Sequence, residues 1–124
     1  MHHDVFSDVL FELREIRDQL RIEVAADELS TWTRCLGEAL MTAHDAVVHA
    51  RDACSAVDHR ATMVAVERLL GKIEAEIQRL SRATLEDSRH AETQIQLGRT
   101  QQVGLTSISE CLQLVEQSHL GRSK

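Results

Sequence analysis

Histidine and cysteine are the side chains of this 124-residue sequence most suited to binding a metal, and the chain has seven and three of them. Four follow one another at intervals of five residues, namely His44, His49, Cys54 and His59. A step of five residues turns about 500° around an α-helix, so these side chains spread around the helix. Metal ligands on one helix need spacings of three or four residues. The pattern excludes a four-ligand site within one helix and leaves a site that joins two helices, with the candidates His44, His49, Cys54 and His90.

Carboxylate and nucleophile motifs are sparse. A di-iron carboxylate bundle needs two Glu-x-x-His pairs, and the chain offers one, Glu116 to His119. Asp87 to His90 has the same interval but the wrong carboxylate. The sequence also lacks a Cys-x-x-Cys-His haem motif, a glycine-rich phosphate loop and a Gly-x-Ser-x-Gly elbow. We therefore expect no catalytic residue, no cofactor and no enzymatic activity.

The segment around His44 contains a candidate signalling histidine. Histidine phosphotransfer domains are helical, have about this length and carry an exposed histidine on an inner helix. The segment Ala43-His44-Asp45-Ala46-Val47 resembles their site in the histidine alone, because the lysine and glycine that follow it in that family are missing. The resemblance implies a phosphotransfer-like signalling domain as a second alternative function.

The bulk composition limits the fold and the partners. Hydrophobic residues make up 43% of the chain and aromatic residues 2%, with no proline, which is typical of a globular protein made of long helices. The length suits one helical domain over residues 1–124. A formal net charge of -6 opposes binding to nucleic acid, and no apolar run approaches the ~20 residues that span a bilayer. Widely spaced cysteines and a polar N-terminus predict reduced thiols in a cytoplasmic protein.

Apolar residues that recur every three or four positions predict the elements that must position these side chains. We expect an all-α, antiparallel helical bundle of four helices, at about residues 4–26, 28–57, 61–82 and 85–118. Asp4 is suited to cap the first helix. The seven-residue spacing of the second stripe slips at Asp58-His59-Arg60, which predicts a turn there.

The boundary between the last two helices has two interpretations. Thr84-Leu85-Glu86-Asp87 has the pattern of a capping box that follows a turn at residues 81–83. Alternatively, the unbroken spacing from Met63 to His119 predicts three helices, with one long C-terminal coiled-coil helix. Between Thr84 and Gln101 the same spacing selects polar or small residues where buried ones should be apolar. This stretch is therefore expected to depend most on a partner.

Small residues indicate where helices approach closely or lose stability. An alanine row along the second helix predicts a close helix contact, with the candidates Ala43, Ala46, Ala50 and Ala53. Gly98 and Gly104 fall within the last predicted helix, where each lowers helix stability by roughly 1 kcal/mol relative to alanine.

Large aliphatic residues mark the strongest seam of the last two helices. We predict that they form the core or an interface, and the candidates are Leu70, Ile73, Ile77, Leu105, Ile108, Leu112 and Val115. The sequence thus predicts a non-enzymatic protein–protein interaction module, such as an adaptor, export-type chaperone or regulator, that binds a partner helix or forms a homodimer. The first alternative is a metal- or ligand-binding helical bundle that uses its His and Cys side chains.

Overall fold

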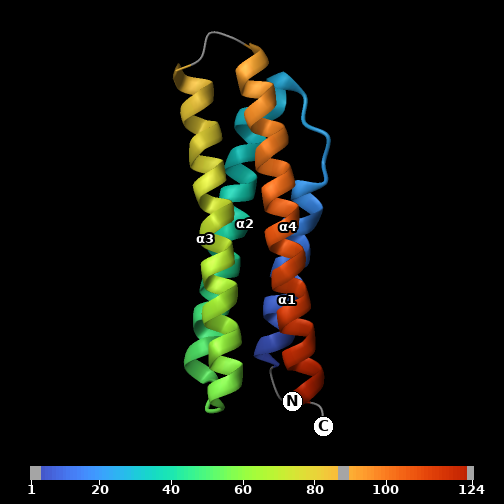
Figure 1. Cartoon of the computed structure of the whole chain (residues 1–124), viewed down its shortest axis with the longest axis vertical. Coiled ribbons are helices and arrows are strands. Elements are labelled where there is room, and N and C mark those ends of the chain that lie inside the picture. The colour runs from blue at the N-terminus through green and yellow to red at the C-terminus, as the bar shows by residue number, and fades with distance from the viewer. Residues whose placement is uncertain (1–3, 87–89, 123–124) are drawn as a thin grey trace.

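The computed structural model describes residues 4–86 and 90–122, which form four α-helices and one short 3₁₀ turn. In chain order they are α1 (Val5–Leu20), η1 (Ala26–Glu28), α2 (Leu29–Ala53), α3 (Val57–Glu86) and α4 (His90–Arg122). The helices pack against one another as an all-helical four-helix bundle, and successive helices run in opposite directions (Figure 1). The predicted fold class is confirmed. The alternative with one long C-terminal helix is wrong, because α3 and α4 lie side by side.

Helix α1 begins where the sequence predicts and ends earlier. The Asp4 side chain accepts a hydrogen bond of 3.0 Å from the Phe6 backbone N–H and so caps the first turn. At the other end, Trp32 Nε1 donates to the Gln19 carbonyl at 2.8 Å. Gln101 Nε2 donates to the carbonyl of Ile22 at 2.8 Å. These donors satisfy carbonyls at the helix end, so the chain turns away there instead of continuing to residue 26.

The turn between α2 and α3 lies earlier than predicted. Helix α2 ends at Ala53, with Cys54 in an extended conformation, and α3 begins at Val57. Asp58-His59-Arg60 is therefore the first turn of α3, and the prediction of a turn at these residues was wrong. Arg60 Nη2 donates to the Cys54 carbonyl at 3.0 Å, which ties the start of α3 to the end of α2.

The capping-box prediction was also wrong in position. Residues 81–83 continue α3, and the Thr84 hydroxyl donates to the Ser81 carbonyl at 2.7 Å instead of capping a new helix. Asp87, the last residue of the predicted box, lies outside the described residues. The fourth helix starts at His90, five residues later than predicted.

The order of the helices around the bundle follows from their contacts. Helix α1 packs along α2 and α4, and α3 packs along the same two helices. Within the described ranges the backbones of α1 and α3 do not approach each other, and the edge-to-face contact of the Phe6 and His59 rings, with centroids 5.4 Å apart, joins these two helices near one end. Helices α1 and α3 therefore occupy opposite corners (Figure 1). All four helices contribute to one core, whose largest fully buried side chains include Phe6, Leu13, Leu36, Ile73 and Ile108.

Helix α4 buries a different set of residues from the predicted stripe in its first half. It buries Thr93, Leu97, Thr100 and Gly104, each one position before the residue that the continuous spacing selects. From Ile108 onward the predicted residues are buried, with Ser107 and Cys111 beside them. The two stripes converge because a straight helix repeats every 3.6 residues, whereas a seven-residue spacing repeats every 3.5.

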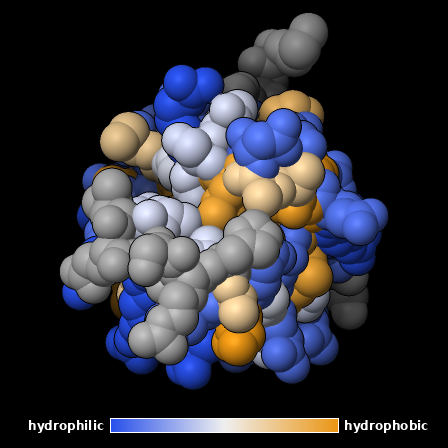
Figure 2. All heavy atoms as spheres, turned by 90° about the horizontal axis from the view of Figure 1, so that it is seen from above, coloured by the Kyte–Doolittle hydropathy of each residue, from blue (hydrophilic) through white to orange (hydrophobic). Residues whose placement is uncertain are grey.

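Polar residues cover most of the periphery in the end-on view, and apolar residues form small, separate areas (Figure 2). Over the residues described, none of the helices has an apolar stretch of the length and hydropathy that a membrane crossing requires.

Candidate functional site

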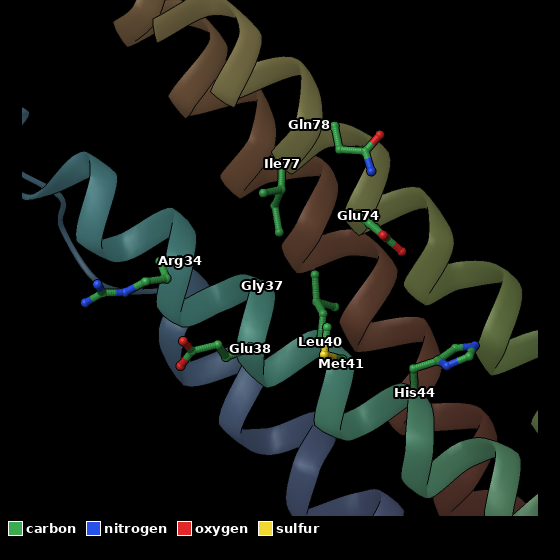
Figure 3. Close-up of a pocket in the computed structure, with 9 residues that line it drawn as sticks. All are labelled: Arg34, Gly37, Glu38, Leu40, Met41, His44, Glu74, Ile77 and Gln78. Carbon is green, nitrogen blue, oxygen red and sulfur yellow. The ribbon is translucent and has the colours of Figure 1, made fainter. Parts of the chain in front are cut away.

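A groove of about 580 Å³ lies between α2 and α3, and we call it the α2/α3 groove (Figure 3). Leu40 and Ile77 form its apolar floor and are buried. Gly37 lies on the α2 side, and a Cβ atom added there meets nothing within 4 Å. One turn further along α2 lies Met41, which is 69% exposed. The groove therefore combines open space with apolar surface that the chain itself does not cover.

Charged and polar side chains form the rim of this groove. Arg34 and Glu38 come from α2, and Glu74 and Gln78 come from α3 (Figure 3). These positions are exposed. Two carboxylates against one guanidinium give the rim an acidic balance, which favours a ligand that carries positive charge.

His44 closes the other end of the groove and belongs to an ion-pair network. Its Nε2 atom lies 3.2 Å from Oε1 of Glu67, and Arg51 Nη1 donates to Oε2 of the same carboxylate at 2.9 Å. Arg51 Nε also donates to Asp52 at 3.2 Å. The hydrogen bond to Asp52 and the nearby charge of Glu67 raise the pKa of Arg51, while desolvation opposes them. The network joins α2 to α3 beside the groove.

The metal candidates do not come together in the parts of the chain that the structure describes. His44 and His49 are exposed on α2, and Cys54 is half-buried at its end. The side chain of His90 lies outside the described residues. Within residues 4–86 and 90–122, no group of three or more His, Cys, Asp or Glu side chains has the arrangement of a metal site.

The seven seam residues lie within the core of this single chain. Six are buried and Leu105 is partly buried against them; the six are Leu70, Ile73, Ile77, Ile108, Leu112 and Val115. Of these, Ile77 also reaches the α2/α3 groove. The seam therefore contributes to the candidate site mainly by holding α3 in place.

The alanine row divides between core and surface. Ala43 and Ala50 are fully buried and Ala46 is partly buried, whereas Ala53, the last residue of α2, is exposed. The buried alanines are on the same face of α2 as Leu36, so they belong to the packing of the bundle rather than to the groove.

Sequence reasoning missed most of the groove residues. Gly37 and Met41 were passed over because they fall beside the apolar stripe that contains Leu36 and Leu40. The available signal was the exposed methionine itself, four residues after a glycine on the same helix. Their partners on α3 have no such signal, because only the packing of the two helices brings Glu74 and Gln78 to the same place.

Comparison of the chain with models of known families, with curated proteins and with solved structures gives no match.

Proposed function

We propose that this chain is a non-enzymatic, cytoplasmic interaction module, and that it binds an amphipathic helix of another protein in the α2/α3 groove. The observation that carries the proposal is Met41, which is 69% exposed above a floor of Leu40 and Ile77. Methionine is common at helix-binding surfaces because its flexible, polarizable side chain adapts to different apolar partners. A helix placed in a groove with two apolar walls buries one face, as in other helix-in-groove complexes.

The rim specifies the chemistry of the partner helix. Glu38 and Glu74 come from opposite walls of the groove, so a bound helix would meet a carboxylate on each side. We infer a partner with apolar residues at positions i, i+3 or i+4 and with lysine or arginine beside them. Arg34 at one end favours an acidic residue at the matching end of the partner and sets its direction.

The burial of the aliphatic seam residues favours binding of a partner at the surface over a core that two copies share. Leu70, Ile73 and Ile108 are already covered by the chain's own helices. A second copy that used these residues would have to displace α4 or α3, and the lost packing of large aliphatic residues costs about 2–5 kcal/mol each. A partner that binds in the α2/α3 groove requires no such opening.

The experiment is a nuclear magnetic resonance titration of the isotope-labelled chain with two designed helical peptides. Both peptides have the same leucine stripe, and one has flanking lysines where the other has flanking glutamates. We expect the lysine peptide to bind more tightly and to shift the amide signals of Gly37, Met41 and Gln78. Met41→Glu should reduce the affinity at least tenfold, because it places a charge beside the apolar floor where the partner's apolar residues must lie.

The matched control is Ile95→Glu, since Ile95 is 73% exposed on α4 and away from the groove. This variant should bind the lysine peptide as the unmodified chain does. An affinity that Met41→Glu leaves unchanged would contradict the proposed site. Amide shifts confined to another face of the bundle would contradict it as well.

A further inference from the structure

A second feature lies on the outward face of α3, opposite the core. Arg68, Lys72, Arg79 and Arg82 are exposed, and their spacing places them within an arc of about 80° around the helix. They extend over about 21 Å of α3. We call this stripe the basic face. Arg79 also bonds the carboxylate of Glu76, whereas among the described residues Arg68 and Lys72 form no ion pair.

The outward face of α1 has the opposite charge. Asp8, Glu12, Glu15 and Asp18 recur at three- and four-residue spacing along about 15 Å of helix, and we call them the acidic face. Partial burial and then the nearby charges of Glu15 and Asp8 raise the pKa of Glu12, so these carboxylates repel one another. Phe11 projects among them and is 59% exposed.

We propose that a second copy of this chain places the acidic face of its α1 on the basic face of α3. The two faces have opposite charge, similar length and the same helical geometry, which is the complementarity that steers and orients association. Phe11 supplies an apolar contact and lies against Gly71 and Ala75, the small residues between the basic side chains of α3. A Cβ atom added at Gly71 meets nothing within 4 Å, so the ring has room to approach the helix. The face of the Phe11 ring also attracts the cationic side chains on either side of it.

The positions of the two helices determine the kind of assembly. Helices α1 and α3 occupy opposite corners of the bundle, so the two faces of one chain look in opposite directions. The contact is therefore heterologous, and each added copy leaves one acidic and one basic face that no other copy covers. We expect open-ended chains of copies whose mean size increases with concentration, instead of a closed dimer. This inference does not rest on the α2/α3 groove, which lies on another side of α3.

The first test is sedimentation velocity over a series of protein concentrations. We expect association at about 0.01 M salt, where the Debye length is about 30 Å, and monomers at about 1 M salt, where it is about 3 Å. Phe11→Ser should weaken the association at low salt without changing the circular dichroism of the bundle. A chain that stays monomeric at high micromolar concentration in low salt would overturn the proposal.

The second test is charge reversal in two variants. Glu15→Lys with Asp18→Lys cancels the net charge of the α1 face, and Arg68→Glu with Lys72→Glu cancels the net charge of the α3 face. Each variant alone should associate far less than the unmodified chain, because one of its two faces no longer has the charge that attracts the other. An equimolar mixture should associate again, since each variant then offers the face that the other one needs.

The matched control for the α1 variant is Glu23→Lys with Asp45→Lys, which changes the net charge by the same amount and in the same direction at exposed positions outside both faces. This control should associate as the unmodified chain does.

A mixture of the two charge variants that remains monomeric would overturn the proposal. So would a monomeric chain that binds a DNA duplex through Arg68 and Lys72, because the basic face would then serve nucleic acid. Met41→Glu should leave self-association unchanged, so failure of this contact and failure of the groove are distinguishable.

Discussion

Gln96 Nε2 donates a hydrogen bond of 3.1 Å to Oε2 of Glu76, a carboxylate that is almost completely buried between α3 and α4. Arg79 bonds the other carboxylate oxygen, and Arg99 Nε lies 3.7 Å from Oε2. The Thr100 hydroxyl accepts from Gln96 at 3.2 Å and donates to the Glu76 backbone carbonyl at 3.3 Å. The buried Glu76 carboxylate keeps these hydrogen bonds in only one relative position of α3 and α4. The hydrogen bonds therefore favour that position over other arrangements of the two helices.

The first prediction concerns this hydrogen bond. Gln96→Leu removes one donor from the Glu76 carboxylate and leaves its buried oxygen short of a partner. We expect a loss of about 1–3 kcal/mol in the free energy of unfolding, measured by urea denaturation. Gln94→Leu, at an exposed position on the same helix, should change stability by no more than about 0.5 kcal/mol. Equal effects of the two substitutions would show that the hydrogen bond to Glu76 contributes nothing.

The second prediction separates the two glycines of α4. Nothing lies within 4 Å of a Cβ atom built at Gly98, so Gly98→Ala should raise stability by about 0.8–1.0 kcal/mol through helix propensity alone. At Gly104 the same atom meets Leu20 Cδ2 at 2.6 Å, and Leu20 is fully buried. Overpacking of a core costs about 1–3 kcal/mol, which offsets or exceeds the gain of about 1 kcal/mol in helix propensity, so Gly104→Ala should be less stable than Gly98→Ala.

A double substitution checks the cause. Leu20→Ala combined with Gly104→Ala should show a favourable interaction, because the smaller side chain makes room for the added methyl group. If the two changes are additive, the contact between Leu20 and Gly104 does not explain the difference.

The helical class of the fold was predictable because apolar residues at steps of three and four need no tertiary information. The residue at which α1 ends was not predictable from this pattern. The last carbonyls of the helix are satisfied by Trp32 and by Gln101, which is 81 residues away from Leu20 along the chain. Donors so distant in sequence leave no local signal, so the sequence pattern extended α1 to residue 26.

The polar first half of α4 shows a related limit. Sequence reasoning treated its polar residues as a defect in burial that a partner would correct. The structure pairs Thr100 and Gln96 with Glu76 inside the chain, so part of that polarity is satisfied internally. The α2/α3 groove was missed for the same physical reason, because two faces must be packed together before Met41 and Ile77 define one surface.

The third prediction concerns Cys111. Burial, and secondarily the charge of Glu110, raise the pKa of its thiol to about 12. Since the thiolate is the reactive form, iodoacetamide at pH 8 should alkylate Cys35 and Cys54 in the folded chain and leave Cys111 unmodified. Mass spectrometry of the digested protein checks this, and denaturant should make all three react. Rapid alkylation of Cys111 under native conditions would contradict its placement in the core.

The same thiol predicts a dependence of stability on alkaline pH. In the unfolded chain the thiol ionises near its ordinary value of 9.0, whereas in the folded chain it stays protonated until about 12. The folded state then binds more protons, so the free energy of unfolding should fall as pH rises between these values. Cys111→Ala should have a flatter profile over this range, measured by urea denaturation at pH 8 to 10.5. An identical slope in the variant would contradict the raised pKa.

The last prediction tests the repulsion on α1. The raised pKa of Glu12, due first to desolvation and then to Glu15 and Asp8, means that the folded chain holds this proton more tightly than the unfolded one. Ionisation therefore lowers stability as pH rises through the carboxylate range. Glu12→Gln should raise stability at pH 7 by about 0.2–0.5 kcal/mol for each like-charge pair removed, and the difference should vanish below about pH 4. Thermal unfolding of dilute protein in 1 M salt should show a smaller gain, because salt screens the charge pairs and leaves the desolvation. Glu23→Gln, outside the acidic face, should show no such pH dependence, and a gain of equal size there would assign the effect to net charge instead.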